Sequence, residues 1–223
     1  MSPRDDIIGY NPEVPTKEIG NNVQWRGCPP EHRIELQAIT EKCFDVFVQN
    51  HIHGFKLNIN TGKVKPICCK QPQHGPHESR VIIALVEKLE RKGIIEDDDG
   101  PWGSLVVLET KPDQAHLHWS DFVFRLCISY CMLNTVKTRP FTFPITRCDE
   151  AGECVGEAQY YITAHLDAGY WQVKMNESSK DRTAFFTPNG KKHCNSMPIG
   201  AMNAHAFFVA MVSKKMEINW NVL

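Results

Sequence analysis

The feature that most constrains the fold of this chain is a 3.6-residue apolar repeat between Glu78 and Lys92. Apolar side chains recur on one helical face, charged side chains occupy the other, and Gly93 follows as a helix stop. The apolar face consists of Ile82, Leu85, Val86 and Leu89. The pattern predicts an amphipathic helix with one face in the core.

Several segments on either side of this helix have the patterns of short strands. They are residues 55–70, 104–109, 123–130, 160–167, 171–175 and 183–187. The first alternates around a turn at Asn60–Gly62, and Asn189–Gly190 is a strong hairpin signal after the last. Residues 202–216 predict a closing helix. Strands and helices mixed without regular βαβ alternation indicate an α+β fold.

Composition limits the classes of function. The chain is 42% hydrophobic and 23% charged, which excludes wholesale disorder. Its apolar runs are too short to span a bilayer and its first residues contain no secretory signal. Nine cysteines without framework spacing indicate reduced thiols, so we expect an intracellular protein (cytoplasm or nucleus) that is not secreted. Because the net charge is −1, any binding of nucleic acid must depend on a local basic patch.

Four blocks, in this order along the chain, carry the most specific patterns. They are LVEKLERKGIIEDDDGPWGSLVVLETKPD, FRLCISYCMLN, YYITAHLDAGYWQVKMNESSKDRTAFFT and SMPIGAMNAHAFFVAMV. Together they resemble the reverse transcriptase of long-terminal-repeat retrotransposons of the Ty3/gypsy type, over roughly residues 55–212. The resemblance implies an α+β fold that combines the fingers with an incomplete palm of a right-hand polymerase, in which helices pack on a mixed or antiparallel sheet.

The same resemblance implies a division of the chain into four regions. Residues 1–30 are rich in proline and predict an extended leader, and residues 31–54 predict a connector helix. Residues 55–145 are expected to form a fingers-like subdomain. Residues 146–223 are expected to form a partial palm that lacks the Tyr-x-Asp-Asp hairpin of the family.

Catalysis in this family is RNA-directed DNA polymerisation, with two Mg²⁺ ions held by three carboxylates. His165 stands at the first carboxylate position, and an imidazole nitrogen is a poor substitute for the oxygen ligands that Mg²⁺ requires. Asp167 is a weak alternative metal ligand, because two residues along a strand displace it by roughly 6.5–7 Å. No Tyr-x-Asp-Asp sequence occurs in the chain, and the acidic run Glu96–Asp99 is expected to be a solvated loop. We therefore expect weak or absent Mg²⁺ binding and no polymerisation.

Contacts with nucleotide are implied at further positions. Arg125 and Lys111 match cations that hold the incoming deoxynucleoside triphosphate, and the backbone N–H groups of Ala168 and Gly169 would bind its phosphates. Tyr170 would either exclude a ribose 2′-hydroxyl or serve as a packing residue of the palm. The turn and helix start that back the nucleotide match Gly200, Met202 and Asn203. The implied partners are this nucleotide and an RNA/DNA template-primer.

Two alternatives remain open. Four potential zinc ligands lie within ten residues, at Cys68, Cys69, His74 and His77, although adjacent cysteines on a strand point to opposite faces. The chain is also consistent with a non-catalytic module, derived from a retroelement, that binds nucleic acid or protein. We further expect self-association, because the segment 160–167 would lack a strand partner and the apolar face of Phe207, Phe208, Met211 and Val212 would be exposed.

Overall fold

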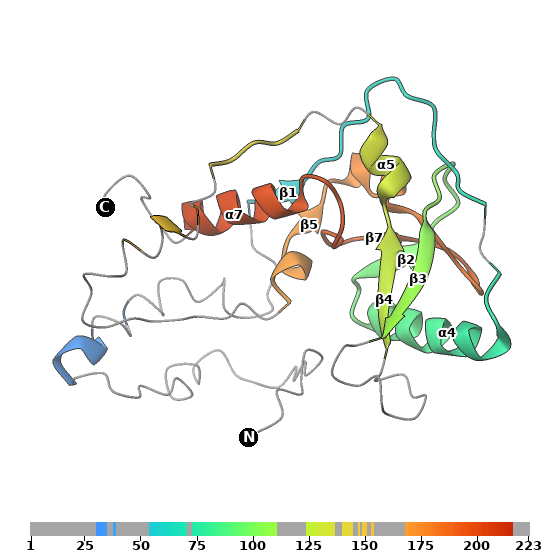
Figure 1. The fold of residues 1–223 in the computed structure, drawn as a ribbon, viewed down its shortest axis with the longest axis horizontal. Helices are drawn as coiled ribbons and strands as arrows, with labels where there is room; N and C mark the ends of the chain where they lie inside the picture. Colours follow the sequence, from blue (N-terminus) through green and yellow to red (C-terminus); the bar gives the residue numbers. More distant parts are fainter. Residues whose placement is uncertain are drawn as a thin grey trace.

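The structure is a computed structural model that describes residues 30–34, 38, 54–70, 73–110, 124–136, 140–144, 147, 149–150, 153 and 168–215. Residues 30–34 are helical, and most of the predicted connector helix lies outside the described residues. The predicted strand 160–167 also lies outside them. Two helices, α4 and α7, lie toward opposite ends of the described body, with the strands between them (Figure 1).

The amphipathic helix is confirmed as α4, Pro76–Arg91. At its start the carboxylate of Glu78 accepts a hydrogen bond from the Gly75 N–H at 3.1 Å, which satisfies one of the exposed backbone donors of the first turn. Gly93 ends the helix with a φ of +64°, a conformation that favours glycine. Val81, Ile82 and Val86 are buried, so the predicted face is the face that packs.

The two predicted strands after α4 are confirmed as an antiparallel ribbon of β3, Leu105–Thr110, and β4, Phe124–Ser129. Val106 and Phe124 are buried on the side of α4. Alternate residues therefore point away from the core, and these include Val107, which is half exposed, and Arg125.

A three-stranded antiparallel sheet has the order β2-β7-β6, with β2 at Ile95–Asp97, β7 at Gly190–Cys194 and β6 at Phe185–Thr187. The hairpin signal at Asn189–Gly190 is confirmed, because Thr187 pairs with Gly190 across the β6–β7 turn. The expectation of a solvated acidic loop is only partly confirmed. Glu96, Asp97 and Asp99 are exposed, but the first two belong to β2, and the Asp98 side chain is only 4% exposed and pairs with Lys191 of β7.

The predicted strand 55–70 is only partly formed. The turn exists, since the Gly62 N–H donates to Asn60 Oδ1 at 2.9 Å, but the chain does not fold back on itself. Instead β1, Lys56–Leu57, pairs in parallel with β5, Lys174–Met175. Pro66 has no backbone N–H, so it could not donate a ladder hydrogen bond in a returning strand.

Short helical turns complete the described part of the chain. The strand expected at 171–175 is shortened to β5, because its first residues belong to the 3₁₀ helix η3, Gly169–Gln172. The other turns are the α-helical α5, Cys131–Thr135, and the 3₁₀ helices η4, Glu177–Ser179, and η5, Asp181–Thr183.

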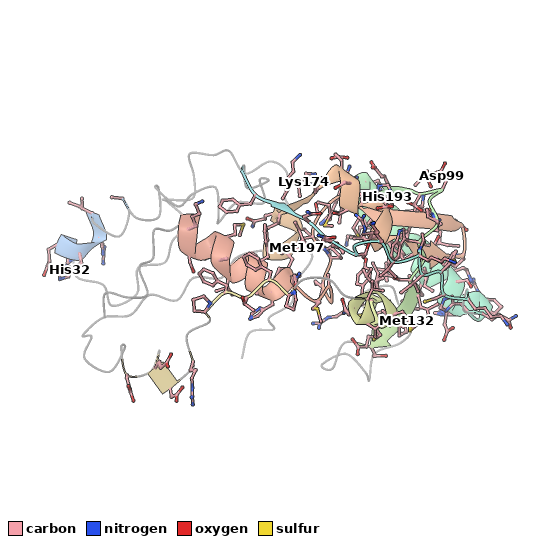
Figure 2. The ribbon with its side chains drawn as sticks, turned by 90° about the horizontal axis from the view of Figure 1, so that it is seen from above. His32, Asp99, Met132, Lys174, His193 and Met197 are labelled. Carbon is pink, nitrogen blue, oxygen red and sulfur yellow. The ribbon has the colours of Figure 1, made fainter. Side chains whose placement is uncertain are left out.

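The closing helix is confirmed as α7, Ala204–Lys215. Its apolar face is not the exposed patch that we expected, because Met211 is fully buried and its apolar neighbours are partly buried against the core. That core is built from Leu57, Ile59, Trp102, Tyr130, Leu133, Val173, Met175, Ala184, Met197, Ala204 and Met211. In Figure 2, Met197 lies between Lys174 and His193 on one side of the body and Met132 on the other.

Three packed clusters hold the described body together. The second joins α4 to the β2-β7-β6 sheet and the β3–β4 ribbon through Ile82, Val86, Ile94, Ile95, Val106, Phe185 and Cys194, and the small third joins α4 to β4 through Val81 and Phe124. Among the helices of the described residues, none is long and apolar enough to cross a membrane. The boundary predicted near residue 145 remains a prediction.

Candidate functional site

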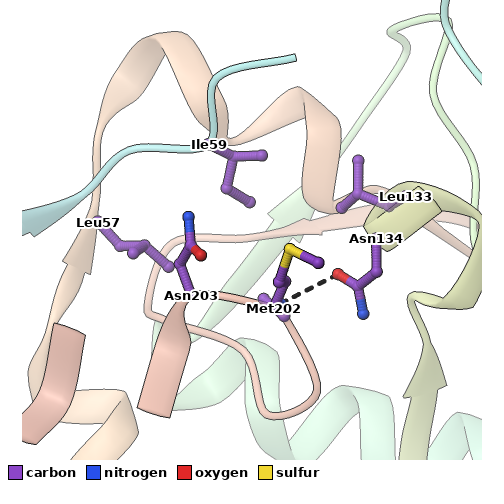
Figure 3. Close-up of a pocket in the computed structure, with 7 residues that line it drawn as sticks. Leu57, Ile59, Leu133, Asn134, Met202 and Asn203 are labelled. Atoms are coloured by element: carbon purple, nitrogen blue, oxygen red, sulfur yellow. Dashed lines mark hydrogen bonds between the residues drawn. The ribbon is translucent and has the colours of Figure 1, made fainter. Parts of the chain in front are cut away.

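The turn before α7 is fixed by one side chain on α5. The Asn134 amide donates from Nδ2 to the Gly200 carbonyl at 2.9 Å. It also accepts at Oδ1 from the Met202 N–H at 3.0 Å (Figure 3). Gly200 has a φ of +92°, which a residue with a Cβ rarely adopts. Two hydrogen bonds from α5 therefore fix the turn that the family resemblance assigns to nucleotide contact.

Asn203 ties a second segment to the start of α7. Its Oδ1 accepts a hydrogen bond from the Phe141 N–H at 3.0 Å. The Phe141 ring packs on Phe207 with 5.7 Å between centroids. Asn203 is therefore a structural connector in this conformation, because its side-chain oxygen already holds backbone.

A small cavity lies beneath this turn (Figure 3). Its walls are Leu57, Ile59, Leu133, Asn134, Ala201, Met202 and Asn203. Its volume is about 10 Å³, which is the space for a single water molecule. Any nucleotide would have to bind on the surface around the turn and not in this cavity.

Tyr170 lies beside the same helix. Its ring packs edge-on against Phe208 of α7, with 5.0 Å between the ring centroids. Its hydroxyl lies 3.3 Å from Nδ1 of His205. Burial raises the pKa of this hydroxyl. Of the two roles expected for Tyr170, packing is observed, and its contact with a sugar remains a proposal.

Ala168 and Gly169 form the turn that carries Tyr170. Ala168 has a φ of +47°, which is uncommon for a residue with a side chain. Its carbonyl accepts from the Trp171 N–H at 2.8 Å and starts η3. This left-handed turn places Tyr170 against α7.

Arg125 is exposed on the outer face of the β3–β4 ribbon. It pairs in register with Glu109, whose carboxylate also accepts a hydrogen bond from the Cys127 thiol at 3.4 Å. Burial and this carboxylate raise the pKa of Cys127. Strand β4 runs from Arg125 toward the turn at 200–203. Its residue Ile128 lies next to that turn, since a Cβ at Gly200 would be 3.7 Å from the Ile128 carbonyl oxygen. The distance from Arg125 to Ile128 along the strand is about 10 Å.

Three predicted site residues, Lys111, His165 and Asp167, lie outside the described residues. Within the described ranges, no group of three or more His, Cys, Asp or Glu side chains is placed to hold a metal ion. The four potential zinc ligands, which are all described residues, do not form such a group either. Cys68 and Cys69 are free thiols, and His74 faces the carboxylate of Glu78 at 3.7 Å.

Sequence reasoning missed the charge network between β2 and β7. His193 lies between two carboxylates, with Nε2 2.8 Å from Glu96 and Nδ1 3.1 Å from Asp98. Hydrogen bonds from Asn195 and His193 lower the pKa of Glu96 to about 2. Lys191 pairs with Asp98 at 2.8 Å. The network joins two strands and neutralises its own cations.

Sequence reasoning also missed Asn134 and His205 as site residues. Both stand inside the matched blocks, and that membership is their only signal in the sequence. Their contacts depend on α5, η3 and α7 meeting in space, which no local pattern reveals.

Comparison with known proteins finds relatives for most of the chain. It is 30% identical over 157 residues to the retrovirus-related Pol polyprotein from transposon opus of Drosophila melanogaster, covering 70% of this chain. It is 35% identical over 152 residues to the Pol polyprotein from transposon 297 of the same species, covering 67%. An RNA-directed DNA polymerase homolog of Oenothera berteroana is 31% identical over 95 residues, which are 42% of this chain and 65% of that protein. No family model matches.

The chain spans only 15% and 14% of the two transposon polyproteins. Among solved structures it is similar to the protease-reverse transcriptase of prototype foamy virus, with a TM-score of 0.65 and 19% identity over 89% of this chain and 26% of that one. The foamy viral enzyme in complex with an RNA/DNA hybrid gives a TM-score of 0.61 and 18% identity, with the same coverage. The fold is therefore that of part of a reverse transcriptase, an α+β polymerase fold fragment.

Proposed function

Because the chain belongs with the reverse transcriptases of retrotransposon Pol polyproteins, we propose that it binds nucleic acid and nucleotide phosphates without catalysing nucleotide addition. The observation that carries the proposal is the turn at 200–203, which Asn134 holds in a fixed conformation beside Tyr170. A surface whose backbone is fixed in advance loses little conformational freedom when a ligand binds.

Two further observations support binding. The foamy viral relative in fold is described in complex with an RNA/DNA hybrid and with double-stranded DNA. In this chain, Arg125 is exposed at the outer face of β4, and its planar guanidinium can donate two parallel hydrogen bonds to a phosphate. We propose that Arg125 and Lys111 contact phosphates, with the turn residues Ala168 and Gly169 near them.

The absence of catalysis is proposed from the chemistry of one position. Reverse transcriptases as a family use divalent metal ions, and Mg²⁺ demands oxygen ligands in octahedral geometry. His165 offers nitrogen at the first ligand position. An imidazole at this position does not fit the oxygen ligand that Mg²⁺ requires, and we propose that it prevents catalysis by this chain.

Binding can be tested with the full chain and a fluorescently labelled RNA–DNA hybrid, measured by anisotropy across a salt series. We expect weak binding that falls steeply with salt, because counterions are released from the phosphates. Arg125→Ala should weaken binding more than Arg91→Ala, a matched change on the exposed side of α4. An equal loss of affinity in both variants would show that Arg125 contributes only general electrostatic attraction. A wild-type chain that does not bind the hybrid would refute the proposal.

The cellular site of this function stays a proposal. The described cysteines 68, 69, 127, 131 and 194 are free thiols, which supports an intracellular, reducing location.

A further inference from the structure

One segment of the chain is free of carboxylates. Residues 46–77 contain no Asp or Glu, but they contain Lys56, Lys63, Lys65 and Lys70. All four lysines are exposed. In a chain of net charge −1, such a stretch is a local concentration of positive charge.

The part of this segment around Lys63 and Lys65 is held in place. The Ile59 N–H donates to Ser179 Oγ at 3.0 Å, and the Thr61 side chain is buried and accepts from Arg182 Nε at 3.0 Å. The Val64 N–H closes the turn on the Thr61 carbonyl at 3.3 Å. The two lysines therefore project from an anchored turn, with the guanidinium of Arg182 beside it.

Three lysines of β7 and the η4–η5 turn are already neutralised by carboxylates. Lys180 pairs with Glu177 at 2.7 Å, Lys191 with Asp98 at 2.8 Å, and Lys192 with Asp97 at 2.6 Å. By contrast, no carboxylate of the described residues forms an ion pair with Lys63 or Lys65. The positive charges of Lys63 and Lys65 are therefore available to a polyanion, unlike those of Lys180, Lys191 and Lys192.

The pairing of β1 with β5 places one further cation, Lys174, opposite Lys56 of this segment. Lys56 and Lys174 are register partners on the parallel strands β1 and β5, and their neighbours Leu57 and Met175 point into the core. Like charges directly opposite each other are destabilising unless an anion lies between them. Glu177 lies close to both lysines and Glu96 close to Lys174, but Glu177 pairs with Lys180 and Glu96 pairs with Lys180 and His193.

We propose that Lys56, Lys63, Lys65, Lys174 and Arg182, the basic ridge, form a second contact surface for the phosphates of a nucleic-acid backbone. The inference rests on the proposed function. Leu57 and Ile59 form a wall of the cavity beneath the 200–203 turn, whereas Lys56 lies on the exposed side of the same segment. The ridge is therefore distinct from the surface that Arg125 and the turn provide.

The test compares two double variants of the full chain that remove the same charge. Lys63→Gln with Lys65→Gln changes the ridge, and Lys88→Gln with Arg91→Gln changes α4. Binding of the labelled RNA–DNA hybrid is measured across a salt series, and thermal melting verifies that both variants are folded. Each lysine that contacts a phosphate contributes about one unit to the slope of log K against log salt.

The ridge variant should reduce this slope by about two units and the α4 variant should leave it unchanged. Binding of the wild-type chain with the same slope in the ridge variant would overturn the ridge and leave the proposed function intact. Equal losses in both variants would also overturn it. A wild-type chain that binds no hybrid would refute the proposed function and the ridge together.

Discussion

The hydroxyl of Tyr170 lies 3.3 Å from Nδ1 of His205, across the junction between η3 and α7. The same tyrosine ring packs edge-on against Phe208, one helical turn further along α7. The left-handed Ala168 aims the tyrosine at the helix, and the histidine fixes its hydroxyl. Tyr170 therefore has a defined orientation without any ligand.

Removing either partner of this hydrogen bond should have the same consequence. Tyr170→Phe and His205→Ala should each lower the free energy of unfolding by about 1 kcal/mol or less, because the bond is partly exposed. The double variant should cost less than the sum of the single changes, which chemical denaturation of all four chains can measure. Additive losses would mean that the two side chains do not interact.

The Asn134 amide makes two separable hydrogen bonds. Asn134→Leu removes both, whereas Asn134→Asp keeps an acceptor for the Met202 N–H. Each lost bond should cost about 1 kcal/mol. Amide exchange followed by NMR should show faster exchange at Met202 in the leucine variant than in the aspartate variant. Equal exchange rates at Met202 in the two variants would show that the hydrogen bond from Met202 to Asn134 does not hold the turn.

Stability should fall at alkaline pH because of a buried thiol. Burial raises the pKa of Cys194 from 9.0 to about 11, and it also raises that of Tyr130, whose hydroxyl lies 3.6 Å from the sulfur. The folded state holds the proton more tightly, so the stability that this proton provides is complete below pH 9 and is lost as pH rises toward 11.

Urea denaturation at several pH values measures this loss. Between pH 9 and 11 the wild-type chain should lose stability more steeply than Cys194→Ala. Cys68→Ala, which alters an exposed thiol, should follow the wild type. Parallel curves for the wild type and Cys194→Ala would contradict the assignment.

The burial of α7 predicts a large effect at one position. Met211 is fully buried in the core, so Met211→Ala should lower the free energy of unfolding by about 2–5 kcal/mol. Val212→Ala, at a partly buried neighbour, should cost clearly less. A loss below 1 kcal/mol for Met211→Ala, measured by denaturation, would support the exposed helix that the sequence had suggested.

Local patterns predicted the elements whose partners are close in the chain. The apolar repeat of α4, the β3–β4 ribbon and the β6–β7 turn each depend on neighbouring residues, and all three are observed. The pairing of β1 with β5 could not be predicted in this way, because Lys56 and Lys174 meet only through the complete fold.

The loop predicted for the acidic run is wrong at two points for a related reason. Glu96 and Asp97 pair as strand β2, and the Asp98 side chain is buried against Lys191 and His193 of the distant strand β7. The site was predicted in part. Gly200, Asn203 and Tyr170 are found around the start of α7, whereas the clamp by Asn134 requires the position of α5.

Primer extension tests the proposal that this chain has part of the fold of a reverse transcriptase and does not catalyse polymerisation. The purified 223-residue chain is mixed with a primed RNA template, deoxynucleoside triphosphates and Mg²⁺ or Mn²⁺. We predict no extension by the wild-type chain. We also predict none by His165→Asp, because the chain contains no Tyr-x-Asp-Asp sequence to supply the other two carboxylates. Measurable, template-dependent extension by the wild-type chain would contradict the account.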